Sequence, residues 1–185
     1  MIPQLAGIET TVISMLPEDL LPFGSTDWWL FAGIALIGRC ADLFSTWIAT
    51  PNLTLEGNPV ARRLGWRWGI PVNFIAALLT GCQPTLAIAV GTTSALVAAR
   101  NLQSAWVMRT MGEGPYRFWM SERICEAPRG LAAACFLGEA LLIGLPGLAL
   151  LVFANNQTIP TGVGLGMVAY SSAVACFTSL ALFRH

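Results

Sequence analysis

The sequence contains no lysine, and its single histidine is His185 at the last position. Charged residues make up 11% of the chain, well below the share of about 25% that is typical of soluble domains. A haem or chlorophyll held by an intramembrane histidine is therefore not expected, and cofactors of other kinds stay unknown. With a net charge of zero and no run of basic residues, nucleic acid is not expected as a partner.

Familiar catalytic motifs are absent as well. The sequence has no HExxH, GxSxG or Walker loop. The five cysteines form no CxxC pair, a pattern typical of cysteines that pack as small apolar residues. Motifs therefore name no catalytic residue and no metal ligand, and whether the protein is an enzyme stays open at this stage.

Hydrophobic residues are abundant and make up 55% of the chain. Apolar stretches of about 20 residues, the length that crosses a bilayer as a helix, recur along it. We therefore expect an all-α integral membrane protein, a bundle of about five transmembrane helices over residues 27–185. The expected spans are approximately 28–50, 66–81, 84–109, 130–154 and 160–182. The breaker cluster from Gly81 to Pro84 predicts the second turn, with 91–93 as the alternative.

The distribution of arginine predicts the orientation. Arginines gather between the first two spans, around the loop between the third and fourth, and at the C-terminus, whereas the other loops contain none. By the positive-inside rule the N-terminus lies outside the cytoplasm and the C-terminus inside. Residues 1–26 are expected to be an extracytoplasmic segment on the membrane surface, because apolar residues recur in it at helical spacing. A bacterial inner membrane is the expected location.

Four ionisable residues, Arg39, Asp42, Arg100 and Glu139, fall inside the expected spans. With a rise of about 1.5 Å per residue, all four lie roughly 12–16 Å from the cytoplasmic helix ends. Charges at that depth are costly and normally face partners. We therefore expect one network that pairs across helices, with Thr46, Asn73 and Asn101 as hydrogen-bonding neighbours.

Small residues recur at three- and four-residue steps along three of the expected spans, which favours close helix packing. The first of these seams also carries Arg39 and Asp42. The seams comprise Ala32, Ala35, Thr46 and Ala49 in the first span, Gly91, Ser94, Ala98, Asn101 and Ala105 in the third, and Gly162, Gly166, Ala169, Ala173 and Cys176 in the fifth.

A second polar group, Glu56, Asn58 and Pro59, follows the first span. One interpretation is a turn in which Asn58 and Pro59 begin the next helix and Glu56 caps it or pairs with a nearby arginine. The other folds Glu56 back beneath Asp42, where two carboxylates and an amide oxygen could hold Mg²⁺ or act as an acid and base pair.

Two boxes in this region resemble the signature of a family of small prokaryotic multi-pass membrane proteins of unknown function. The first is an Asp-x-x-Ser/Thr-Thr box late in the first span, and the second is a Glu-x-Asn-Pro box in the following loop. The matching residues are Asp42, Ser45 and Thr46, then Glu56, Asn58 and Pro59. The resemblance covers about the first half of the chain and implies a fold and two marked sites, but no reaction.

Three functional hypotheses follow from these patterns. The leading one is an accessory or assembly subunit of a membrane complex, or a homo-oligomer, because the small-residue seams favour association with partner membrane subunits. The second is a transporter or channel-like protein that uses the intramembrane Arg, Asp and Glu residues. The third is a membrane-embedded enzyme acting on a lipid-phase substrate through Asp42, Glu56 and Asn58.

Overall fold

A computed structural model describes residues 20–183, and these residues form six α-helices and no strand. The helices are α2 (Thr26–Ala49), α3 (Pro59–Thr80), α4 (Pro84–Met111), α5 (Glu113–Glu126), α6 (Arg129–Phe153) and α7 (Thr158–Phe183). The all-helical class expected from the sequence is confirmed. Most of the expected N-terminal surface segment, residues 1–19, lies outside the described residues.

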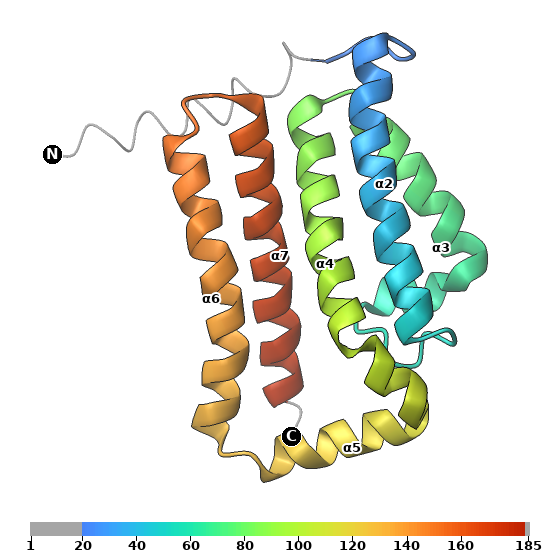
Figure 1. The fold of residues 1–185 in the computed structure, drawn as a ribbon, viewed down its shortest axis with the longest axis vertical. Coiled ribbons are helices and arrows are strands. Elements are labelled where there is room, and N and C mark those ends of the chain that lie inside the picture. The colour runs from blue at the N-terminus through green and yellow to red at the C-terminus, as the bar shows by residue number, and fades with distance from the viewer. Residues whose placement is uncertain (1–19, 184–185) are drawn as a thin grey trace, which may run out of the picture.

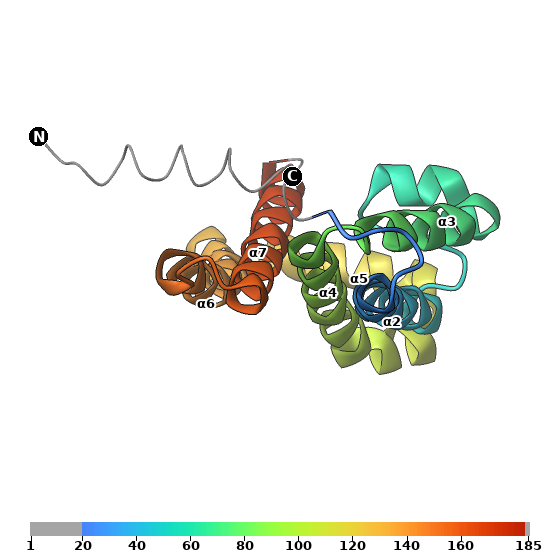
Figure 2. The same ribbon diagram turned by 90° about the horizontal axis from the view of Figure 1, so that it is seen from above.

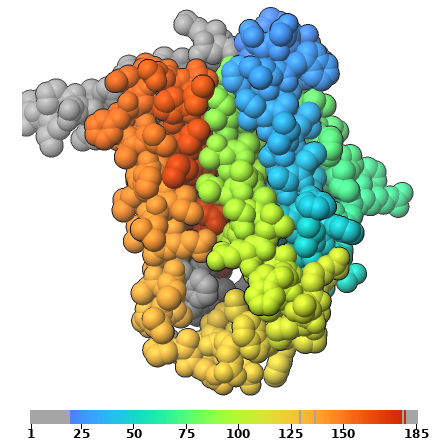
Figure 3. Space-filling view, in the orientation of Figure 1, coloured from blue at the N-terminus to red at the C-terminus, as the bar shows by residue number. Residues whose placement is uncertain are grey.

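The long helices α6, α7, α4 and α2 stand beside one another in that order, and α5 runs crosswise beneath them (Figure 1). Seen from above, α3 lies on one face of the row, and α7 leans toward the same face at its C-terminal end (Figure 2). On the opposite face, α6 and α4 cover much of α7 (Figure 3). The helices form an open layer. Among the long helices, α6 packs against α7 and against no other.

The contacts between α2 and α4 show that these two helices run in the same direction. Gly81, just before α4, lies against Ala32 near the start of α2, and Gly38 lies against Gly91 farther along. The backbone N–H of Leu21, before α2, also donates to the carbonyl of Cys82 at 2.8 Å. The start of α4 therefore lies beside the start of α2, and the chain between them must return along the full height of the row.

Small residues allow the helix backbones to approach closely at three interfaces. A Cβ atom built on Gly162 of α7 would lie 2.7 Å from the Ile88 side chain of α4, and one on Gly164 would lie 2.8 Å from the carbonyl oxygen of Gly147 in α6. Larger side chains would force these helices apart. In α2 and α4 the predicted seams face each other, with Ala35 and Ala98 buried.

Helix α3 is interrupted near its start. Gly65 has φ +61° and ψ −173°, a conformation that is open to glycine and strained for other residues, and Pro71 lies farther along. The part after the kink, from residue 66 on, coincides with the expected second span. The turn that follows lies at residues 81–83, as the breaker cluster predicted, and α4 begins at Pro84.

Four helices are long and apolar enough to cross a membrane, namely α2, α4, α6 and α7. These four helices correspond to four of the five expected spans and are compatible with a multi-pass membrane protein. Helix α3 does not meet the same criterion, because it carries Arg62, Arg63 and Arg67. Helix α5 was not expected, because the sequence predicted only a loop between the third and fourth spans.

Candidate functional site

The guanidinium of Arg39, in the middle of α2, joins three helices. Its Nη1 lies 2.9 Å from Asp42 Oδ2 and donates to Ser94 Oγ of α4 at 3.2 Å, and its Nη2 donates to Asn73 Oδ1 of α3. The Asn73 amide in turn donates to the Gly69 carbonyl at 2.7 Å. The expectation that the charges pair across helices is wrong for Arg39 and Asp42, which lie one turn apart on α2, where a pair at i and i+3 forms without a neighbouring helix.

The predicted hydrogen-bonding neighbours Asn101 and Thr46 are in direct contact. Asn101 Nδ2, on α4, donates to Thr46 Oγ1 at 3.0 Å and to Ser45 Oγ at 3.3 Å. Ser45 Oγ donates to the backbone carbonyl of Asp42 at 2.9 Å. This cluster extends the Arg39 group by one helical turn toward the α5 end of the molecule.

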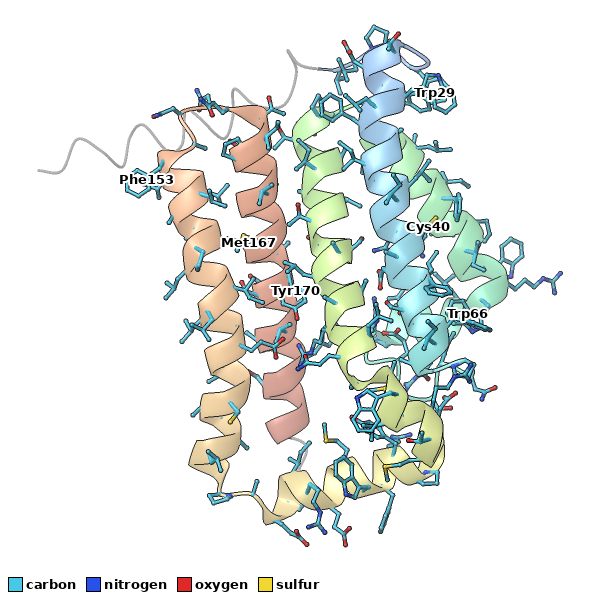
Figure 4. The ribbon with its side chains drawn as sticks, in the orientation of Figure 1. Trp29, Cys40, Trp66, Phe153, Met167 and Tyr170 are labelled. Atoms are coloured by element: carbon cyan, nitrogen blue, oxygen red, sulfur yellow. The ribbon has the colours of Figure 1, made fainter. Side chains whose placement is uncertain are left out.

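A second ion pair joins α4 to α6. Arg100 Nη1 lies 3.4 Å from Glu139 Oε1, and the same oxygen accepts a hydrogen bond of 2.8 Å from the Tyr170 hydroxyl of α7. Figure 4 places Tyr170 in the middle of α7, on the side toward α4. The structure therefore has two polar groups, centred on Arg39 and on Arg100, in place of the single ion-paired network expected from the sequence.

Both groups border an open cavity of about 680 Å³. Its floor is formed by α2 and α4, and its walls by α3 and α7, which do not pack against each other. The lining includes every predicted site residue except Glu139 and Pro59, that is, Arg39, Asp42, Thr46, Glu56, Asn58, Asn73, Arg100 and Asn101. Residues from two separate sequence patterns thus meet at one cavity.

The ion pairs at the cavity are only partly buried. The side chains of Arg39 and Asp42 are 27% and 14% exposed, and those of Arg100 and Glu139 are 37% and 34% exposed. A purely architectural pair inside a membrane protein would be expected to lie in a dry interior, where charges are costly unless fully satisfied. The partial exposure of Arg39, Asp42 and Arg100, which line the cavity, favours a cavity that water can enter.

The Glu56 to Pro59 segment starts a helix, as the first interpretation of the sequence held. Asn58 is the N-cap of α3, and its Oδ1 accepts from the backbone N–H of Val60 at 2.9 Å, with Pro59 in the first helical turn. Glu56 Oε1 accepts from the N–H of Asn58 at 2.8 Å. The Asn58 oxygen is therefore engaged in capping, which weakens the case for it as a cation ligand.

Glu56 nevertheless faces the cavity that Asp42 lines, and the two carboxyl groups interact electrostatically. Among the described residues Glu56 forms no ion pair, including with Arg62 or Arg63. Within residues 20–183 there is also no group of three or more His, Cys, Asp or Glu side chains placed to hold a metal ion. The candidate site therefore consists of charged and amide side chains that line the cavity.

Sequence analysis did not single out Glu113, which anchors the loop between α2 and α3. Its carboxylate accepts from Thr50 Oγ1 at 2.8 Å and from the backbone N–H groups of Asn52 and Thr54 at 2.9 and 3.0 Å. Desolvation acts to raise the pKa of Glu113, but the hydrogen bonds from Asn52, Thr54 and Thr50 outweigh it and lower the pKa from 4.5 to about 2. The Glu-Gly-Pro sequence at residues 113–115, at the start of α5, was the available signal.

Comparisons of the chain with protein-family models, with curated proteins and with solved structures find no match. The resemblance carried by the two boxes at Asp42 and Glu56 therefore stays a prediction. The candidate site has to be interpreted from its own geometry.

Proposed function

We propose that this chain is a transporter-like membrane protein that admits a polar group into the cavity between α3 and α7. The observation that carries the proposal is the shared cavity, whose charged lining residues come from three segments: Arg39 and Asp42 of α2, Glu56 of the loop before α3, and Arg100 of α4. In this account Asp42 and Glu139 exchange protons or bind cations. Their ion-pair partners Arg39 and Arg100 hold the two carboxyl groups in position.

The proposal includes five membrane crossings. Helices α2 and α4 run in the same direction, so a chain that crosses through both of them must cross back between them. Only α3 and its flanking loops are available for that return. The arginines of α3 are compatible with such a crossing, because Arg62 and Arg63 lie in its first turns at the membrane edge, where long basic side chains extend to water.

We further propose that the end of the molecule carrying α5 faces the cytoplasm of a bacterial inner membrane, with the N-terminus outside. Arg62, Arg63, Arg109, Arg117 and Arg123 lie in or beside α5 and the first turns of α3. Trp29 and Phe153 are exposed at the opposite end, where aromatic side chains suit the membrane interface (Figure 4). The cavity would then open from the cytoplasmic half of the bilayer.

The accessory-subunit hypothesis has less support in this geometry. Its motivation was a set of small-residue seams free to bind a partner, and the seams of α2 and α4 and the first part of the seam on α7 are already packed within the chain. The enzyme hypothesis loses a proposed cation ligand, because Asn58 caps α3. Self-association through the lipid-facing surface stays compatible with a transporter.

Proton flux in proteoliposomes that contain a pH-sensitive dye tests the proposal. With an imposed membrane potential, vesicles with the protein should move protons faster than protein-free vesicles, and Asp42→Asn and Glu139→Gln should each lower the rate at least about tenfold. Glu126→Gln on α5, far from the cavity, is the matched control and should leave the rate unchanged. A flux that is absent, or unaltered in both cavity variants, would overturn the proposal.

A further inference from the structure

Two charges at the cavity have no opposite charge beside them in its lining. The Asp42 carboxylate is paired with Arg39, and both belong to the lining. Arg100 also lines the cavity, but its partner Glu139 is not part of the lining. Glu56 lines the cavity without any ion pair among the described residues. The cavity therefore presents one cation, Arg100, and one anion, Glu56, to whatever enters.

These two charges come from different sides of the cavity. Arg100 belongs to α4 and lies near Tyr170 of α7, whereas Glu56 belongs to the loop before α3. Asp42 lies on α2 and interacts electrostatically with Glu56, so the two carboxyl groups lie near the same part of the cavity. A ligand that satisfies both sides carries an anionic and a cationic group.

The two walls of the cavity also carry apolar side chains. Leu64 and Val72 of α3 face the cavity from one wall, and Val174 and Phe177 of α7 from the other. The cavity is open, and α3 and α7 do not pack against each other, so no helix–helix interface seals the space between its two walls. A ligand can therefore place its polar group at the floor while its hydrocarbon part leaves between the walls.

We propose that the cavity binds a bilayer phospholipid whose head carries a phosphate and an ammonium group. The phosphate lies at Arg100 and the ammonium at Glu56 and Asp42, with the acyl chains passing between α3 and α7. Arginine forms charge-assisted hydrogen bonds with phosphate oxygens, and a carboxylate accepts them from an ammonium. The inference rests on the proposed function, since it names the substrate class of the same cavity.

Native mass spectrometry of the protein in detergent, with phosphatidylethanolamine and phosphatidylglycerol of identical acyl chains, tests the inference. The first lipid has a phosphate and an ammonium group, whereas the second has only the phosphate. We expect the wild-type protein to retain phosphatidylethanolamine about tenfold more strongly, the change expected for one charge-assisted contact. Glu56→Gln should abolish this preference, whereas Arg100→Gln should weaken both lipids, with Arg100→Lys losing less.

Two control variants on α5, Glu126→Gln and Arg117→Gln, should bind both lipids as the wild type does. Circular dichroism and monodisperse elution show whether each variant is folded, which matters most for Glu56→Gln because Glu56 is partly buried and accepts from the Asn58 N–H at 2.8 Å. Equal retention of the two lipids by the wild type, or a preference that survives Glu56→Gln, would overturn the inference. If the lipid preference is absent but proton flux still depends on Asp42, only the phospholipid inference is overturned. If the lipid preference is present but there is no proton flux, only the proposed transport function is overturned.

Discussion

Gly38 of α2 and Gly91 of α4 are in direct backbone contact. A Cβ atom on Gly38 would lie 2.8 Å from Gly91 Cα and 2.9 Å from the Gly91 carbonyl oxygen, closer than Cβ atoms approach other backbone atoms in proteins. The contact lies next to Arg39, whose guanidinium reaches Ser94 on the facing helix. Close approach of the two helices therefore determines the geometry at the floor of the cavity.

Replacing Gly38 by alanine should destabilise the protein, because the added methyl group forces α2 and α4 apart. The expected loss is on the order of 1–3 kcal/mol, the range for overpacked interiors. Gly33 on the same helix is the matched control, since a Cβ there meets nothing within 4 Å. Thermal unfolding in detergent should show a lower midpoint for Gly38→Ala only, and equal midpoints would contradict the packing of α2 on α4.

Glu113→Gln should destabilise the loop between α2 and α3 at neutral pH. Hydrogen bonds to a carboxylate are stronger than those to an amide, and at this partly exposed site the loss should be about 1–2 kcal/mol. Denaturation at pH 7 measures the difference, and Glu122→Gln on the same helix is the control. A variant as stable as the wild type would show that the loop does not depend on the charge.

The same pair of proteins predicts a dependence on pH. The pKa of Glu113 is lowered from 4.5 to about 2, so its stabilising contribution is complete above pH 4.5 and is lost as the pH falls toward 2. The stability difference between the wild type and Glu113→Gln should therefore be constant above pH 4.5 and shrink below it. A difference that grows as the pH falls would have the wrong sign for this account.

The ion pair between Arg100 and Glu139 should contribute measurable coupling. Glu139→Gln alone leaves the Arg100 charge without its partner inside the membrane, whereas the double variant with Arg100→Gln removes both charges. A double-mutant cycle on unfolding free energies should give a coupling of about 1–2 kcal/mol.

The pair Arg123 and Glu126 on α5 is the control for that cycle. Its two atoms are closer, at 2.6 Å, but both side chains are about half exposed, and the coupling should stay below about 1 kcal/mol. Equal coupling in the two pairs would mean that Arg100 and Glu139 lie in water as freely as a surface pair.

Gly65→Ala should strain the kink in α3, because φ is +61° at this position. With ψ at −173°, this backbone conformation is essentially restricted to glycine, and it costs a residue with a Cβ on the order of 1–3 kcal/mol. Gly69→Ala, in the regular part of the helix with nothing within 4 Å of the added atom, should be neutral or stabilising by up to about 1 kcal/mol. Thermal unfolding of both variants measures the contrast, and a Gly65→Ala protein as stable as Gly69→Ala would argue for a straight α3.

Apolar stretches long enough to cross a bilayer predicted the long helices well because each long helix depends on its own apolar residues. The bounds of α2 and α6 differ from the expected spans by one or two residues. The turn at residues 81–83 was equally predictable, since Gly81 and Pro84 interrupt a helix whatever surrounds them. By contrast, α5 carries Arg117 and Glu122 among aromatic residues and lacks a clear apolar face, so composition alone suggested a loop.

The candidate site was only partly predictable from the sequence. Residue type and depth identified Arg39, Asp42 and Arg100, because ionisable side chains in a span stand out from their neighbours. The sequence could not show that Glu56 meets the same cavity, since that depends on how the loop before α3 folds. Tyr170 was missed because a tyrosine in an apolar helix resembles ordinary packing until its contact with Glu139 is known.

Water access to the cavity is the most direct test of the account. In a protein whose five native cysteines are replaced, Ala173→Cys places a thiol in the cavity wall, and Leu142→Cys places one at a similar height on the outer side of α6. The two heights agree because Gly144 lies against Ser171 in antiparallel helices. A membrane-impermeant maleimide should label Ala173→Cys in inside-out vesicles and leave Leu142→Cys unlabelled. If neither thiol reacts from either side, the cavity is closed to water and the proposed substrate pathway is wrong.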